Sequence, residues 1–195
     1  MSNAFTIGHS TRTVDELIAL LREHGIRLLV DVRRFPGSRR HPQFGKEALQ
    51  HTLAGAGIAY RHAEALGGRR PVDPDSVSSG WRNAGFRGYA DYMQTPEFGA
   101  ALAELESLIA STRVAVMCAE AVPWRCHRNL IADALVAHGH DVFHIIAAGD
   151  VRAHALPPHA RITGDQRVTY PGNVRSEGRG ERSEKQGRDD QLGML

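Results

Sequence analysis

The chain has 195 residues, of which 42% are apolar and 24% charged, with a formal net charge of +2 at pH 7. This length predicts one domain with a short extension, and the composition excludes a wholly disordered chain or a polycation, although not a local basic site. No run of eighteen apolar residues and no secretory leader is visible, so we expect neither a transmembrane span nor secretion. Two cysteines predict a reduced, cytoplasmic protein rather than a disulfide scaffold.

Strand-like and helix-like segments alternate along most of the chain. Thr13 and Glu16 form a capping-box pair before an apolar stripe, which predicts a helix start, and Thr95-Pro96 predicts another. The segment 62–87 is rich in Gly, Pro and Ser, which favours a long loop or lid. In chain order, the predicted elements are a strand over 4–8, a helix over 13–24, a strand over 27–32, a helix over 46–56, a strand over 58–61, a helical turn over 89–94, a helix over 95–111, a strand over 114–118, a helix over 126–138 and a strand over 141–146.

This alternation predicts an α/β fold. Nearly continuous apolar strands between helices are typical of a parallel sheet covered on both faces, so we expect a three-layer, Rossmann-like domain with a mostly parallel sheet of about five strands. We assign residues 1–170 to this single domain. Residues 171–195 contain five basic and five acidic side chains but few apolar ones, which predicts a disordered tail.

Three polar clusters directly follow predicted strands: residues 8–12, residues 31–41 and residues 118–128. Ligands of parallel sheets bind at the carboxyl ends of the strands, so we expect the three clusters to meet at one edge. Between Val32 and Lys46 the chain has four arginines and no acidic residue. Planar guanidinium groups suit phosphate or carboxylate ligands, so this loop is a candidate anion site, although a solvated basic loop is the alternative.

The third cluster combines a turn with a helix start. Backbone amides at a helix N-terminus beside Arg125 and Arg128 can bind an anion, and a thiol at that position has a lowered pKa. Glu120 is unusual among these cations, which predicts a role in proton transfer or in orienting a ligand hydroxyl. The structural alternative is that Cys118 and Cys126 pack in the core and Glu120 pairs with an arginine.

Two other chemistries remain open for this cluster. A cysteine before an arginine resembles the loop of a thiol-nucleophile phosphatase or sulfurtransferase, but six residues separate Cys118 from Arg125 and the loop lacks glycines. A zinc site can draw on cysteine and histidine ligands here, although the sequence has no Cys-x-x-Cys pair. The candidate zinc ligands are Cys118, Cys126, His127 and His9.

The first two clusters can also contact an anion. Amides and hydroxyls of Ser10 and Thr11 can cradle a phosphate, or can simply form the turn, and His9 can transfer a proton near neutral pH. Arg33 and Arg39 can clamp phosphate oxygens while Asp31 orients a guanidinium group. Aromatic side chains that can stack a base, with packing as the alternative, are Phe35, Phe44, Tyr60, Trp81 and Phe86. Histidines without a motif, expected at the surface, are His24, His51, His138 and His154.

Five segments together resemble the bacterial and archaeal "domain of unknown function 488" family. They read TIGHSTRTVDELIALL, LLVDVRRFPGSRRHPQF, GIAYRHAEALGG, GFRGYADYMQTPEF and AVMCAEAVPWRCHRNLIADAL, and they extend over about residues 5–146. The resemblance implies a compact α/β fold and leaves the reaction open. The polar signature positions it implies are His9, Ser10, Asp31, Arg33, Ser38, Tyr60, His62, Cys118, Glu120, Cys126, His127 and Arg128.

We therefore expect a cytoplasmic enzyme that hydrolyses, or transfers a group from, a phosphate-bearing nucleotide or nucleic-acid component. The predicted catalytic residues are Glu120, His9, Cys118 and His127. The predicted substrate- or anion-binding residues are Ser10, Thr11, Asp31, Arg33, Ser38, Arg39, Tyr60, His62, Arg125, Cys126 and Arg128. No cofactor is predicted, and zinc on Cys118, Cys126 and His127 is the metal alternative. The rival function is a non-catalytic nucleotide- or nucleic-acid-binding module, which would show a long basic surface and salt-dependent binding.

Overall fold

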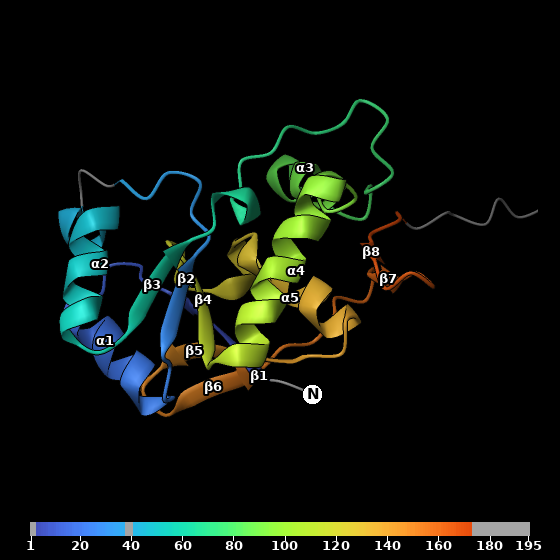
Figure 1. Cartoon of the computed structure of the whole chain (residues 1–195). Coiled ribbons are helices and arrows are strands. Elements are labelled where there is room, and N and C mark those ends of the chain that lie inside the picture. Colours follow the sequence, from blue (N-terminus) through green and yellow to red (C-terminus); the bar gives the residue numbers. More distant parts are fainter. Residues whose placement is uncertain (1–2, 38–40, 173–195) are drawn as a thin grey trace, which may run out of the picture.

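A computed structural model describes residues 3–37 and 41–172 of the chain. Its centre is a six-stranded sheet with the order β3-β2-β4-β1-β5-β6, in which β6 alone runs antiparallel to its neighbour (Figure 1). The strands are β1 (Asn3–Gly8), β2 (Leu28–Asp31), β3 (Ala59–His62), β4 (Val114–Cys118), β5 (Asp141–Ala147) and β6 (Asp150–Ala153). A separate two-stranded ribbon pairs β7 (Arg161–Ile162) with β8 (Val168–Thr169).

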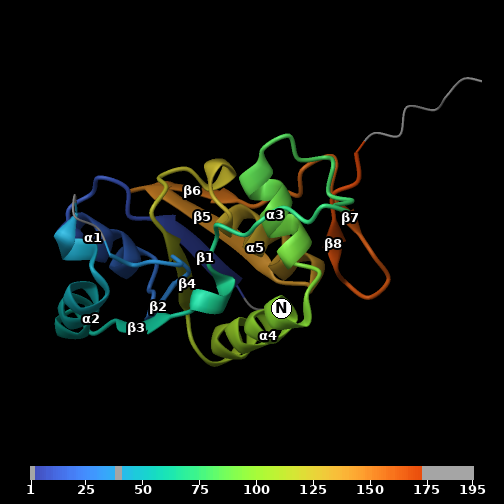
Figure 2. The same cartoon turned by 90° about the horizontal axis from the view of Figure 1, so that it is seen from above.

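Helices cover both faces of this sheet, so the predicted three layers are present (Figures 1 and 2). The helices of one face are α1 (Val14–Glu23) and α2 (Lys46–Gly55). The helices of the other face are α3 (Ala84–Tyr92), α4 (Pro96–Ser111) and α5 (Arg128–Ala137). Three single-turn helices lie in the connecting loops, namely η1 (Pro42–Phe44), η2 (Glu64–Leu66) and η3 (Pro123–Arg125).

Strand β4 shows how the sequence builds the two cores. All five of its residues are buried, as expected for an inner parallel strand. Because successive side chains of a strand point to opposite faces, Val114 and Val116 join the core beneath α4 and α5. Ala115 and Met117 join the core beneath α1 and α2.

Two of the predicted helix starts are confirmed. The Thr13 hydroxyl accepts a hydrogen bond from the Glu16 amide at 3.2 Å, and the Glu16 carboxylate accepts one from the Thr13 amide at 2.7 Å, so the capping box at α1 is confirmed. Thr95 caps α4, with Pro96 at the first helical position.

Several predictions need correction. The sheet gains the antiparallel strand β6, and α3 begins at Ala84, inside the predicted long loop. His154 is not a surface residue, because its side chain is 2% exposed and its Nε2 lies 2.7 Å from Asp133 Oδ1. The predicted tail falls almost wholly outside the described residues. No helix among those described has the length and apolarity needed to cross a membrane.

The strand order creates a crevice at the carboxyl edge of the sheet. Strands β2 and β4 are neighbours, but β2 leads to α2 on one face and β4 leads to α5 on the opposite face. Where two adjacent parallel strands send their connections to opposite faces, the loops separate and leave a ligand-binding crevice. The loops after β2 and β4 hold the second and third polar clusters, so the fold positions both at this crevice.

Candidate functional site

The three polar clusters meet at the carboxyl edge, as predicted. The amides of His9 and Ser10 donate to the carbonyls of Cys118 and Ala119 at 3.0 and 2.8 Å, which joins the loops after β1 and β4. The amide of Val32 donates to Met117 O at 2.9 Å and joins the loop after β2 to the same strand. These backbone bonds fix the relative positions of the side chains that follow.

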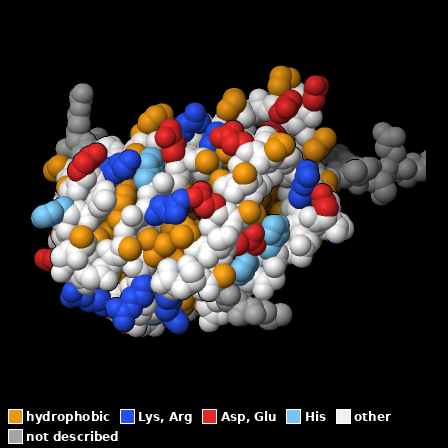
Figure 3. All heavy atoms as spheres, viewed as in Figure 1, with side chains coloured by type: hydrophobic (Ala, Val, Ile, Leu, Met, Phe, Trp, Pro, Cys, Tyr) orange, Lys and Arg blue, Asp and Glu red, His pale blue; other side chains and the backbone are white. Residues whose placement is uncertain are grey.

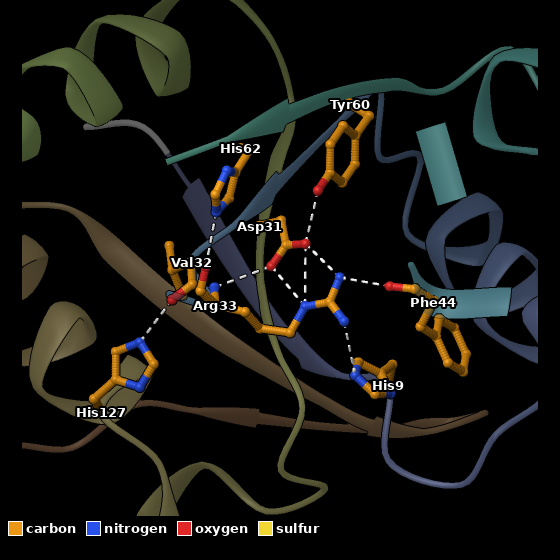
Figure 4. A network of polar contacts seen from close by, with 8 residues as sticks. All are labelled: His9, Asp31, Val32, Arg33, Phe44, Tyr60, His62 and His127. Carbon is orange, nitrogen blue, oxygen red and sulfur yellow. Dashed lines mark hydrogen bonds and ion pairs between the residues drawn. The ribbon is translucent and has the colours of Figure 1, made fainter. Parts of the chain in front are cut away.

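A buried ion pair between Asp31 and Arg33 lies at the centre of the site (Figure 4). Arg33 donates from Nε to the two Asp31 oxygens at 2.9 and 3.1 Å and from Nη2 to Oδ2 at 2.5 Å. The Asp31 side chain is 0% exposed and that of Arg33 7%. Although burial opposes the charged form, the hydrogen bonds and charge of Asp31 raise the pKa of Arg33. The guanidinium group is therefore charged and held in one orientation.

Neighbouring groups complete this orientation. Tyr60 on β3 donates its hydroxyl to Asp31 Oδ2 at 2.8 Å, and burial together with the Asp31 charge raises the pKa of Tyr60 well above its usual range. His62 Nε2 donates to the carbonyl of Arg33 at 2.8 Å, while Arg33 Nη2 donates to the carbonyl of Phe44 at 2.9 Å. Tyr60 thus contacts the carboxylate of the ion pair, and His62 contacts the backbone of Arg33.

His9 is a neutral imidazole packed against the ion pair. Its ring stacks on Phe44 with centroids 4.2 Å apart, and its Nδ1 donates to the Ser10 carbonyl at 3.0 Å. Its Nε2 lies 3.4 Å from Arg33 Nη1. Burial and then the charge of Arg33 lower the pKa of His9 from 6.5 to about 4. Near pH 7 the Nε2 lone pair therefore faces the guanidinium group and can accept its hydrogen bond.

A group of two thiols and one imidazole lies beside the ion pair. Cys118 ends β4, and Cys126 and His127 directly precede α5. The His127 Nδ1 is 3.9 Å from Cys118 Sγ and 3.7 Å from Cys126 Sγ. Hydrogen bonding between the thiols shifts their pKa values in opposite directions. The pKa of Cys118 rises far above its usual range, and that of Cys126, next to the charge of Arg128, falls to about 7.

Two adjoining cavities open over these groups. The smaller has a volume of about 190 Å³, and the larger about 560 Å³. They share Arg33, Phe35, Arg69 and Ala119. The smaller cavity is also lined by Arg34, Gly68, Cys118 and His127. The larger cavity is also lined by His9, Ser10, Thr11, Gly37, His41, Glu120, Ala121, Val122 and Arg125.

Unusual backbone geometry is concentrated at the larger cavity. Among the described residues, three that are not glycine have a positive φ, and two of these, Ser10 at 49° and Arg69 at 59°, line this cavity. Such conformations cost free energy and gather at functional sites. Gly8 is required for a different reason, because a Cβ there would lie 1.8 Å from the Glu120 carbonyl oxygen. The loop after β4 therefore crosses directly over the end of β1.

Residues 13–135 match the family described as Domain of unknown function DUF488. The chain belongs to this family. No curated protein and no solved structure matches the chain. The stretch that matches the DUF488 family contains the second and third polar clusters, and the first cluster precedes it.

Within the DUF488 match, the predicted site residues fall into two groups. Glu120 and Arg125 are exposed and line the larger cavity. Arg128 is 1% exposed and donates to the backbone carbonyls of Glu120 and Ala121 at 2.5 and 2.8 Å. It therefore holds the loop after β4 by its carbonyls, and its Nη atoms are engaged by the protein itself. Two predicted residues, Ser38 and Arg39, lie outside the described residues.

Sequence reasoning missed two cavity residues, Arg34 and Arg69. Arg69 follows a Gly-Gly pair, and a Cβ at Gly68 would lie 2.8 Å from the Nδ1 of His127. The glycine pair thus lets residues 67–69 approach the site closely, and it is the sequence signal that could have identified Arg69.

Proposed function

We propose that this protein is an enzyme that binds a phosphate-bearing substrate, a nucleotide or a nucleic-acid component, and hydrolyses it or transfers a group from it. The observation that carries the proposal is the pair of cavities at the crevice, which three loops line with arginines. Arg33, Arg69 and Arg125 line the larger cavity, and Glu120 is the one carboxylate among its described lining residues. An excess of guanidinium groups in one hollow favours a ligand with several negative charges.

The fixed orientation of Arg33 supports an anion site rather than a solvated basic loop. Asp31 and the carbonyl of Phe44 restrain the Arg33 side chain and occupy its Nε and Nη2, so Arg33 is a fixed group in the cavity wall. The exposed Arg69 and Arg125 are the guanidinium groups open to a ligand. The position at the carboxyl ends of β2 and β4 supports a Rossmann-like use of this fold.

An aromatic ring at the mouth of the cavities supports a nucleotide in particular. Phe35 is 63% exposed, and the guanidinium groups of Arg34 and Arg69 lie 5.9 and 6.0 Å from the centre of its ring. An exposed ring beside cations can stack a base whose phosphate lies against the arginines. Phe44, whose carbonyl accepts from Arg33, cannot stack a base in this way, because it is fully buried and stacks on His9.

Glu120 is the better placed of the two proposed proton-transfer groups. Glu120 is exposed, whereas both ring nitrogens of His9 already contact protein groups. We therefore assign Glu120 as the general acid or base. His9 then acts on the substrate mainly through its contact with Arg33. Both cysteines are free thiols, in accord with the cytoplasmic location that we propose.

The rival function, a module that binds nucleic acid along an extended surface, has less support. On the face that Figure 3 shows, basic and acidic side chains alternate over the upper part of the molecule, and a group of basic side chains lies along its lower left edge. A pocket-sized ligand fits the concentration of arginines at the cavities better.

The test is to incubate the protein with nucleoside mono-, di- and triphosphates, dinucleotides and short oligonucleotides, and to identify the products by mass spectrometry. Glu120→Gln should lower the rate about 100-fold or more, the usual contribution of a general acid or base. Glu47→Gln, an exposed residue on α2, is the matched control and should keep the wild-type rate.

Anion binding is measured separately by calorimetry with pyrophosphate. Arg125→Ala should weaken binding. Arg27→Ala should not, because Arg27 is an exposed arginine that does not line the cavities. Failure of the wild-type protein to bind pyrophosphate or any nucleotide would overturn the proposal. Binding without any product, with a steep salt dependence, would favour the rival module.

A further inference from the structure

Three metal-ligand atoms converge at the carboxyl end of β4. The sulfurs of Cys118 and Cys126 and a ring nitrogen of His127 all lie within 4.8 Å of one another. Both cysteine residues are buried, at 7% and 4% exposure, and His127 is half-buried. The two cysteines come from opposite ends of the loop after β4, so the turn of η3 between them brings the sulfurs together.

The orientation of His127 is fixed by a hydrogen bond on its far side. Its Nε2 donates to the carbonyl of Val32 at 3.0 Å (Figure 4), so a neutral ring carries its lone pair on Nδ1. This Nδ1 faces both sulfurs. One lone pair accepts one thiol proton in a well-aligned hydrogen bond, so the second thiol is left with the sulfur of the first, which is a weak acceptor.

The distances agree with a shared metal ion. Zinc binds sulfur at about 2.3 Å and nitrogen at about 2.0–2.1 Å with tetrahedral angles, which places sulfur and nitrogen ligands about 3.6 Å apart. The two sulfur–nitrogen distances here are 3.7 and 3.9 Å. We propose that Cys118 Sγ, Cys126 Sγ and His127 Nδ1 bind one zinc ion. Thiolate and imidazole ligands in a tetrahedral arrangement are the set that favours zinc.

The surroundings of His127 match those of a metal-binding histidine. Such histidines nearly always donate their second ring nitrogen to a carbonyl or carboxylate, and the Val32 carbonyl has this role. Gly68 also matters, because a Cβ at this residue would lie 2.8 Å from Nδ1, next to the ion. A glycine keeps that approach free.

The fourth coordination position faces the smaller cavity, which Cys118 and His127 line together with Arg33, Arg34 and Arg69. Three protein ligands with one open position are typical of catalytic rather than structural zinc. Water or an anionic group of a substrate can occupy this position. The binding of a substrate group at the open position rests on the proposed function, whereas the metal site itself does not.

The metal site is tested by measuring zinc per chain, by elemental mass spectrometry, in protein purified without chelators. We expect about one zinc per chain in the wild type and less than about a tenth of that in Cys118→Ser and in Cys126→Ser. His62→Gln is the matched control, because His62 also donates Nε2 to a β2-loop carbonyl but is not part of the thiol group. Circular dichroism of each variant establishes that it is folded.

A cobalt-substituted protein provides a second measurement that does not depend on activity. Tetrahedral cobalt with two thiolates should show a sulfur-to-cobalt charge-transfer band, and pyrophosphate should shift the visible bands if the open position takes an anion. Wild-type protein without zinc and without this band would overturn the metal site, as would a Cys118–Cys126 disulfide found in the metal-free protein. Bands that pyrophosphate leaves unchanged, in a protein that still binds pyrophosphate, would overturn only the role of the open position.

Discussion

Acidification should destabilise the folded chain through His9. Its imidazole is 4% exposed, stacks on Phe44 and lies 3.4 Å from the cation of Arg33, so protonation of the ring is opposed in the folded state. The pKa of His9 is lowered to about 4, first by burial and then by Arg33, from 6.5 in the unfolded chain. Between these two pH values the unfolded chain binds a proton that the folded chain does not. The free energy of unfolding therefore falls as the pH falls from about 6.5 to 4.

The size of this effect follows from the difference in pKa. One pKa unit corresponds to about 1.36 kcal/mol, so the full loss below pH 4 is about 3 kcal/mol. At pH 5 the unfolded histidine is almost fully protonated and the folded one is largely neutral, which gives a loss of about 2 kcal/mol relative to pH 7.5. Other groups also titrate in this interval, so the contribution of His9 is the difference between the wild type and a His9 variant.

Urea unfolding at pH 7.5 and pH 5.0 measures this difference. In His9→Gln, whose amide oxygen can still accept from Arg33, the free energy of unfolding should fall by about 2 kcal/mol less than in the wild type. His51→Gln on α2, which is exposed, controls for the removal of a histidine as such. Burial also lowers the pKa of His144 to about 3, but His144 is present in every variant, so its contribution cancels in the difference between wild type and variant. An equal loss in wild type and His9→Gln would refute the reasoning.

Two further predictions concern the scaffold of the site, and urea unfolding measures both. Asp31→Asn leaves the buried charge of Arg33 without its counter-ion, so the free energy of unfolding should fall by about 3–5 kcal/mol, and a loss below about 1 kcal/mol would contradict the buried ion pair. Gly8→Ala places a Cβ 1.8 Å from the Glu120 carbonyl oxygen and should cost about 1–3 kcal/mol. Gly99→Ala, inside α4 with no atom within 4 Å of the added Cβ apart from the helix's own backbone, is the control and should instead stabilise the chain by up to about 1 kcal/mol.

The layers of the fold could be predicted because local chemistry decides them. The capping box of Thr13 and the fully buried pattern of β4 each depend on residues close together in the chain. Strand β6 was missed although its partner is close in the chain, because Ala147 of β5 pairs directly with Asp150 of β6. Its sequence, Asp150–Ala153, is short and half polar, and it becomes a strand because β5 offers it an unpaired edge. The turn before it, with Gly149 at a φ of 69°, is the local signal that could have identified this hairpin.

Convergence of the polar clusters could be predicted for a related reason. In a parallel sheet, the carboxyl ends of all strands lie on one side, whatever the strand order, so a residue that follows a strand is placed at that edge by topology alone. The strand order itself, with β4 between β2 and β1, was not predictable from spacing. This order makes β2 a neighbour of β4, and it thereby brings Cys118 and His127 beside Arg33.

What spacing leaves undecided is which polar atoms face a ligand and which are used by the protein. Arg125 and Arg128 are three residues apart, yet Arg125 is exposed at a cavity and Arg128 is buried on the carbonyls of Glu120 and Ala121. Arg125 is the last residue of η3, whereas Arg128 is the first residue of α5 and donates to carbonyls of the preceding loop. A guanidinium group whose two terminal nitrogens already have backbone acceptors gains less from a new anion than one still hydrated by water. The anion affinity of this site should therefore depend on Arg125 and Arg69 directly, and on Arg128 only through the position of the loop that carries Glu120.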